Sequence, residues 1–278
     1  TLALALAPHA TARLARYARN STSHPGRCDR NVFEREFYLL AKGLEPTSDK
    51  VTAHSYETMY GTFVYPLKFA AHTPRVLEIG LGCNMDYGPG ASVQIWRQLL
   101  PHAELWEAEY DDECVKKARA KGQLEGIKTV TGDQGDFAVL RRWAEEIGGE
   151  LDVIIDDGGH KNSQIGHSFD VLWPLVRNGG VYVIEDLQVG RFKSYGGENI
   201  NYEDTEGRGV MADKIKDWIE QLLTIPRAFK HTSGFKHKIP DDVSFVYCQL
   251  EACVIGKRNR HVEGSRPGLP GHDFPGRR

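Results

Sequence analysis

The sequence lacks long apolar runs and a strong charge of either sign. Nowhere in its 278 residues do about 18 apolar residues follow one another, which is the length that a membrane-spanning helix needs. The formal net charge is only −3, so no overall positive field attracts nucleic acid. We therefore expect neither a membrane span in this chain nor a nucleic-acid partner.

Cysteine is scarce and shows no pattern. The chain has five cysteines, which form no CxxC pair and no Cys/His set with metal-ligand spacing. We therefore expect neither a disulfide scaffold nor a zinc site. The compartment stays open: it is the cytoplasm, or the secretory lumen if residues 1–7 are the end of a removed N-terminal anchor.

The sequence does contain the regular alternation of an α/β domain. Apolar residues make up 40% and charged residues 26% of the chain, as in ordinary globular proteins. Alternating strands and helices predict a mostly parallel sheet with right-handed crossovers and helices on both faces. The strands are predicted at 75–79, 104–109, 127–131, 151–155 and 180–184, and the helices at 91–100, 111–121, 136–147 and 163–173. A helix at 210–223 and closing strands at 243–247 and 252–255, one of them antiparallel, complete the prediction.

One compact domain is predicted at 32–257, between a loosely ordered arm at 1–31 and a disordered basic tail at 258–278. Its first part, 32–73, is a helical and aromatic cap that begins with a helix at about 32–43. The aromatic residues of this cap are either a lid over a ligand or plain core packing, which is the commoner fate of such a stripe. They are Tyr56, Tyr60, Phe63 and Tyr65.

The most informative stretch is LDVIIDDGGH at 151–160. A buried strand ends on Asp156 and Asp157, and two glycines lead to His160. The next strand ends in the same way, on Glu185 and Asp186. Ligands of open α/β sheets bind at the carboxyl ends of the strands. Four acids and an imidazole at this edge indicate a bound cation, which would compensate their charge.

Polar groups at three other strand ends predict a cofactor site. The segment Glu78–Gly82 places Gly80 and Gly82 directly after a strand, where glycine lets the backbone approach a ligand closely. Glu109 ends the second strand, in position for ribose hydroxyls, as in dinucleotide folds. Asp133 and Gln134 follow the third strand, where an adenine edge would lie.

The glycine turn also limits which cofactor is expected. The sequence GLG lacks the third glycine of a dinucleotide fingerprint, and the chain has no phosphate-cradling GKS or GKT. The cofactor therefore carries adenosine without a pyrophosphate, which points to S-adenosylmethionine.

These motifs together resemble a known family. Residues 76–190 resemble the class I S-adenosylmethionine-dependent methyltransferases. More narrowly, IIDDGGH followed by YVIEDLQ is similar to the metal-dependent sugar O-methyltransferases of macrolide biosynthesis and to the cephalosporin-hydroxylase-like family. The segment from about 50 to 256, with VTAHSYETMYGT and LEIGLGCNMDYGPGASV, is also similar to the eukaryotic hard-surface-induced proteins. The macrolide-sugar enzymes have DDGSH, so Gly159 departs from their motif.

The resemblance implies a role for each residue of the motif. It implies that Asp157, Glu185 and Asp186 hold Mg²⁺, that His160 is the general base, and that Asp156 faces the cofactor or is structural. His167 is expected to be structural. Mg²⁺ prefers oxygen ligands and stabilises a developing alkoxide, and an imidazole accepts protons near neutral pH.

The expected function is therefore Mg²⁺-dependent O-methylation of a sugar or other vicinal-diol hydroxyl. Alternatives are a methyltransferase of catechol-like or other small-molecule hydroxyls, and a non-catalytic S-adenosylmethionine-binding protein. The expected partner is a small-molecule or glycan acceptor, and a homo-oligomer stays open. The loop after Asp186 either binds this acceptor or is simply solvated. Its polar residues are Gln188, Arg191, Lys193 and Tyr195.

Overall fold

The computed structural model describes residues 31–196, 210–224 and 235–259. Nearly all of the predicted arm at 1–31 and of the predicted tail at 258–278 lies outside these ranges, so those two predictions stay untested. None of the helices in the described ranges combines the length and the apolar character needed to cross a bilayer.

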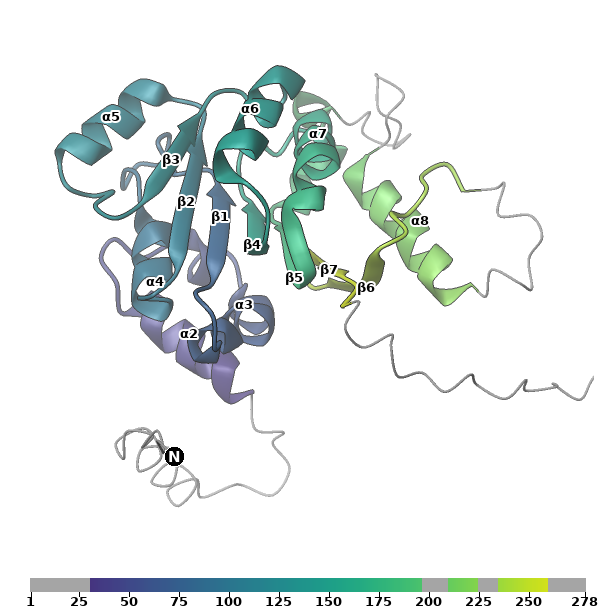
Figure 1. Cartoon of the computed structure of the whole chain (residues 1–278), viewed down its shortest axis with the longest axis horizontal. Coiled ribbons are helices and arrows are strands. Elements are labelled where there is room, and N and C mark those ends of the chain that lie inside the picture. Colours follow the sequence, from purple (N-terminus) through teal and green to yellow (C-terminus); the bar gives the residue numbers. More distant parts are fainter. Residues whose placement is uncertain (1–30, 197–209, 225–234, 260–278) are drawn as a thin grey trace, which may run out of the picture.

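A single seven-stranded sheet forms the centre of the molecule (Figure 1). Its order is β3-β2-β1-β4-β5-β7-β6. The first five strands in the chain are parallel, whereas β7 runs antiparallel to both β5 and β6. The strands are β1 Arg75–Ile79, β2 Glu104–Glu109, β3 Lys128–Thr131, β4 Leu151–Asp156, β5 Val176–Ile184, β6 Val243–Cys248 and β7 Cys253–Lys257. The predicted fold class is confirmed.

Helices cover both faces of the sheet (Figure 1). Side chains of α2 to α5 share one apolar core with one face, and side chains of α6 to α8 share a second core with the other. The helices are α2 Val32–Lys42, α3 Glu57–Phe63, α4 Ala91–Leu99, α5 Asp112–Ala120, α6 Phe137–Ile147, α7 Asn162–Leu172 and α8 Met211–Leu223. Short 3₁₀ helices are η1 Asp49–Val51, η2 Tyr65–Phe69, η3 Trp173–Leu175, η4 Leu187–Arg191 and η5 Lys193–Tyr195.

Local sequence explains these elements. In β4, Val153 and Ile155 face one core while Ile154 faces the other, so a continuous apolar run is buried on both sides. Helices α5 and α6 begin where Asp111 and Asp136 cap backbone amides with their carboxylates. Most predicted elements therefore agree with the structure to within a residue or two.

One predicted boundary was wrong. The strand β5 begins at Val176, not at residue 180, and Val176 already pairs with Leu151. A register shift between Leu151 and Val153 and the positive φ of Gly179, 82°, interrupt the regular pattern. Gly179 and Gly180 are therefore part of an irregular strand.

A charged cluster around Glu104 joins the first residues of β1, β2 and β3. Its carboxylate accepts hydrogen bonds from Trp106, Arg75 and Lys128 at 2.7–2.9 Å. Burial would raise the pKa of Glu104, but these bonds outweigh it and lower the pKa to about 2. The carboxylate is therefore ionised throughout the neutral and mildly acidic range.

Four of the cysteines form two disulfides, although the expectation of no disulfide scaffold did not single out either pair. Cys83, in the loop after β1, is bridged to Cys114 in the first turn of α5, and Cys248 is bridged to Cys253 across the β6–β7 turn. The first pair is 31 residues apart in sequence. The packing of β1 beside β2 brings those two thiols together, so the spacing of the cysteines in the sequence does not indicate that they pair.

Candidate active site

A cavity of about 680 Å³ opens at the carboxyl ends of β1, β2 and β4. The chain turns to one side of β1 for β2 and β3, and to the other side for β4 and β5, so the cavity lies at the topological switch point. Nine of the residues singled out from the sequence line it: Gly80, Gly82, Glu109, Gln134, Asp157, Gly159, His160, Asp186 and Tyr195.

The glycine turn and the DDGGH loop touch each other across the top of β1 and β4. Gly80 has a φ of 110°, and a Cβ at this position would collide with the carbonyl oxygen of Asp157. Glycine is therefore required here both for conformation and for space. Gly159, the departure from DDGSH, leaves room for the side-chain amide of Gln164.

Glu109 holds the two loops that flank the cavity. Its Oε2 accepts a hydrogen bond from the backbone N of Leu81 at 3.1 Å, and its Oε1 accepts one from the N of Asp111 at 3.0 Å. The residue is only 9% exposed. Its carboxylate therefore fixes the glycine turn to the start of α5 and still faces the cavity.

Gln134 lies at the cavity wall, but its side-chain amide is already engaged. Its Nε2 donates to Asp156 at 2.9 Å and to Ser168 at 3.0 Å, and its Oε1 accepts from the N of Gly159 at 2.7 Å. Asp156 is 1% exposed and also accepts a bond from Tyr182. Burial raises the pKa of Asp156. The side chains of Gln134 and Asp156 thus hold the DDGGH loop in place.

Three predicted cofactor contacts, Glu78, Asp133 and Asp156, do not line the cavity. Glu78 is fully buried and accepts hydrogen bonds from Ser92 and Trp96, on the inner side of α4. Asp133 accepts bonds from the N of Gly135 and from Gln164. The structure therefore gives no support for direct contact of Glu78, Asp133 or the buried Asp156 with a cofactor.

His160 faces two of the predicted metal ligands. Its Nε2 lies 3.9 Å from Oδ1 of Asp157 and 3.6 Å from Oδ2 of Asp186. One potential ligand atom from each of these three residues lies within 4.8 Å of the others. Their side chains are about one-fifth exposed, so they are reachable from the cavity.

The backbone is strained at the same place. His160 and Asp186 have φ values of 55° and 53°, in the left-handed region that side chains other than glycine rarely adopt. Two of the four such residues in the described ranges therefore lie in this cluster. Strain of this kind persists when surrounding contacts enforce it, and it gathers at functional sites.

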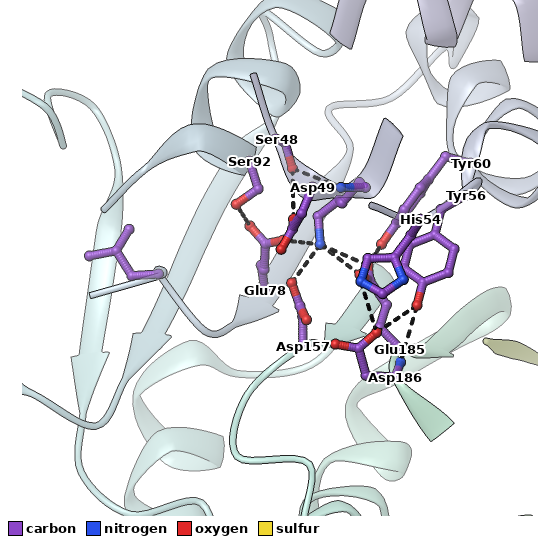
Figure 2. A network of polar contacts seen from close by, with 12 residues as sticks. Ser48, Asp49, His54, Tyr56, Tyr60, Glu78, Ser92, Asp157, Glu185 and Asp186 are labelled. Carbon is purple, nitrogen blue, oxygen red and sulfur yellow. Dashed lines mark hydrogen bonds and ion pairs between the residues drawn. The ribbon is translucent and has the colours of Figure 1, made fainter. Parts of the chain in front are cut away.

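Glu185 lies in a buried charged network and is not part of the group formed by Asp157, His160 and Asp186. Figure 2 shows Glu78, Asp157 and Glu185 approaching one another, with Tyr60 reaching Glu185 from the other side. The ammonium of Lys50 lies between them, 2.7 Å from Oδ2 of Asp157 and 2.8 Å from Oε1 of Glu185. Burial raises the pKa of Glu185 well above its usual range, and the charge of Asp157 raises it further, against the opposing effect of Lys50.

Asp186 is held by aromatic residues of the N-terminal cap (Figure 2). Tyr56 donates a hydrogen bond to its Oδ1 at 2.7 Å, and Nε2 of His54 lies 3.5 Å from the same oxygen. His54 also contacts Glu251 at 2.7 Å. Burial would raise the pKa of Asp186, but the Tyr56 bond and the neighbouring imidazoles lower it on balance.

Two residues of the cap, Lys50 and His54, are the part of the site that the sequence interpretation missed. Tyr56 and Tyr60 are fully buried, which agrees with the core-packing alternative, and their hydroxyls also contact the acid cluster. Lys50 was not singled out at all. Its only local signal is its place in an otherwise apolar and aromatic cap, together with His54 and the two tyrosines.

The polar residues of the loop after Asp186 make two kinds of contact. The guanidinium of Arg191 forms a bidentate ion pair with Asp213 of α8, at 2.7 and 2.8 Å, so Arg191 has a structural role. Tyr195 lines the cavity, and Gln188 donates to Asp186 at 3.3 Å. His167 bonds the carbonyl of Gly135 and stacks on a neighbouring aromatic ring, in keeping with a structural role.

One solved methyltransferase shares this architecture. The MycE methyltransferase from the mycinamycin biosynthetic pathway, solved in complex with Mg and SAH, superposes with a TM-score of 0.61 at 24% identity. The match covers 88% of this chain and 58% of that one. The chain has the class I methyltransferase fold. No family model matches it.

Curated relatives of this methyltransferase-fold chain are O-methyltransferases. The L-olivosyl-oleandolide 3-O-methyltransferase of Streptomyces antibioticus is 40% identical over 194 residues, covering 60% of this chain and 48% of the relative. The mycinamicin VI 2''-O-methyltransferase of Micromonospora griseorubida is 37% identical over 151 residues, covering 53% and 35%. The chain thus spans less than half the length of these two relatives.

Proposed function

We propose that this chain is an S-adenosylmethionine- and Mg²⁺-dependent O-methyltransferase that acts on a hydroxyl of a sugar or another vicinal diol. The observation that carries the proposal is the placement of His160 against Asp157 and Asp186 at the mouth of the cavity. The names of the relatives support it, because one contains an olivosyl group and another, from Streptomyces olivaceus, a rhamnosyl group.

The cofactor would lie over the glycine turn. Gly80 and Gly82 offer close approach of the backbone, and the Glu109 carboxylate offers an acceptor for ribose hydroxyls. S-adenosylmethionine, when bound, supplies an activated methyl group, so the protein mainly has to orient the acceptor and remove its proton. The roles proposed for Glu78, Asp133 and Asp156 are indirect, since these residues brace the cavity wall.

The donor set at the mouth fits Mg²⁺. Asp157 and Asp186 present carboxylate oxygens that are partly exposed, with Glu185 behind them, and oxygen donors are what this ion prefers. Mg²⁺, when bound, would stabilise negative charge on an acceptor oxygen. We propose Asp157, Glu185 and Asp186 as its ligands, which requires Glu185 to release part of its contact with Lys50.

His160 is proposed as the general base. Its Nε2 faces the two carboxylates, so a hydroxyl that contacts them is within reach of the imidazole. The proton would move from the acceptor hydroxyl to Nε2 as the oxygen attacks the methyl group.

The decisive experiment combines binding and turnover. Calorimetry should detect S-adenosylhomocysteine binding, and transfer of radiolabelled methyl groups to a panel of methyl glycosides should require Mg²⁺ and stop in EDTA. A panel of catechols serves as the comparison. Methylation of catechols alone would replace the sugar acceptor in the proposal. Binding without turnover on either panel would favour a non-catalytic cofactor-binding protein, and full activity in EDTA would contradict the metal requirement.

A further inference from the structure

The buried lysine of the acid cluster has a place of its own in this site. Lys50 belongs to η1 and is fully buried. Its Nζ lies 2.7 Å from Oδ2 of Asp157, 2.8 and 2.9 Å from the two oxygens of Glu185, and 3.3 Å from Oε1 of Glu78. All three hydrogens of the ammonium therefore have carboxylate partners.

The contacts of Lys50 overlap with the proposed metal ligands. Lys50 occupies both oxygens of Glu185, while Asp157 is divided between two neighbours. Oδ2 of Asp157 faces Lys50, and its Oδ1 faces His160. Asp157 and Glu185 would therefore contact both Lys50 and a bound divalent ion.

At this point one ammonium group faces several carboxyl groups. Glu78, Asp157 and Glu185 surround one ammonium, and Asp186 adds another carboxylate at the mouth. Carboxylate oxygens of Glu78, Asp157 and Glu185 lie within 3.3 Å of Nζ of Lys50 and stabilise its charged form. Lys50 is therefore a permanent positive charge beside the candidate ion.

We propose that Lys50 is a resident counter-cation that competes with the divalent ion for Asp157 and Glu185 and thereby sets how tightly that ion binds. This inference rests on the metal site of the proposed function. When no ion is bound, Lys50 keeps the buried acids from repelling one another. When the ion binds, its attraction to these acids is reduced by the neighbouring positive charge.

The test compares two charge changes of opposite sign. Lys50→Met removes the positive charge, so the variant should melt at a lower temperature in EDTA, recover in Mg²⁺, and bind Mg²⁺ at least tenfold more tightly by calorimetry. Glu78→Gln leaves the charge of Lys50 less compensated, so Mg²⁺ should bind more weakly. Gln can still accept the bonds from Ser92 and Trp96, which favours folding of this variant.

A matched control separates this effect from the simple loss of a buried lysine. The side chain of Lys257 is 9% exposed and bonds the backbone carbonyls of Trp173, Pro174 and Val176, away from the cavity. Lys257→Met should lose thermal stability equally in EDTA and in Mg²⁺, with unchanged Mg²⁺ affinity.

The outcomes distinguish this inference from the proposed function. Unchanged or weaker Mg²⁺ binding in Lys50→Met, with a stability loss that Mg²⁺ does not reverse, overturns the role of Lys50 and leaves the metal site standing. If Lys50→Met does not fold, unchanged or tighter binding in Glu78→Gln overturns it instead. If the unaltered chain binds no Mg²⁺ but Lys50→Met does, the metal requirement fails while the competition by Lys50 is supported.

Discussion

The carboxylate of Glu109 joins two halves of the proposed cofactor site, and its replacement has a calculable effect. The Glu109→Ala change leaves the amides of Leu81 and Asp111 without the acceptors that now lie at 3.1 and 3.0 Å. A buried donor without a partner costs about 1–3 kcal/mol, so the free energy of unfolding should fall by about 2–4 kcal/mol without any ligand. Urea denaturation measures this part of the effect.

The cofactor adds a second loss. A hydrogen bond from a ribose hydroxyl to a charged acceptor contributes about 1.5–3 kcal/mol, which corresponds to a factor of about 10 to 100 in Kd. We therefore expect S-adenosylhomocysteine to bind Glu109→Ala about 10- to 100-fold more weakly in calorimetry. Glu109→Gln retains one oxygen acceptor, so it should regain part of the stability and little of the affinity.

Glu107→Gln is the matched control for this prediction. Glu107 lies two residues earlier on β2 and is 2% exposed. Burial and the neighbouring Glu78 raise its pKa well above the usual range, and Gln has nearly the same shape as its side chain. Its replacement should leave cofactor affinity within about twofold. Unchanged affinity in Glu109→Ala, or equal losses in both variants, would refute the assignment of Glu109.

Three other predictions address the base, the sheet and the disulfide. His160→Ala should lower turnover about 10²-fold or more while His167→Ala loses little beyond stability, and equal losses in methyl-transfer assays would exclude His160 as the base. Glu104→Gln should lower the free energy of unfolding by about 1–2 kcal/mol at pH 7. The pKa of Glu104 in the folded state, about 2, lies below its value in the unfolded chain. Urea titrations should therefore show the stability difference between the two proteins vanishing as pH falls from about 4.5 toward 2. Replacing both Cys83 and Cys114 by Ser should lower the free energy of unfolding by about 3–4 kcal/mol, because the bridge closes a span of 31 residues, and an unchanged urea midpoint would contradict this.

The sequence by itself determined the sheet and the edge that carries the site. Strand and helix patterns are local, so alternating periodicity predicted nearly every element and the parallel order of the first five strands. Because the carboxyl ends of parallel strands meet at one edge, the same patterns predicted that Glu109, Asp157, His160 and Asp186 gather around one cavity.

The tertiary structure decided what each of these acids contacts. Lys50 is 107 residues from Asp157 and 135 from Glu185 in sequence, and no local pattern reports a contact across such separations. The same holds for the Cys83–Cys114 bridge. A periodic pattern specifies which face of an element is buried, but the packing of η1 and α3 over the sheet decides which buried charges meet. That packing made Lys50 part of the acid cluster and brought Glu185 into buried contacts with Lys50 and Tyr60.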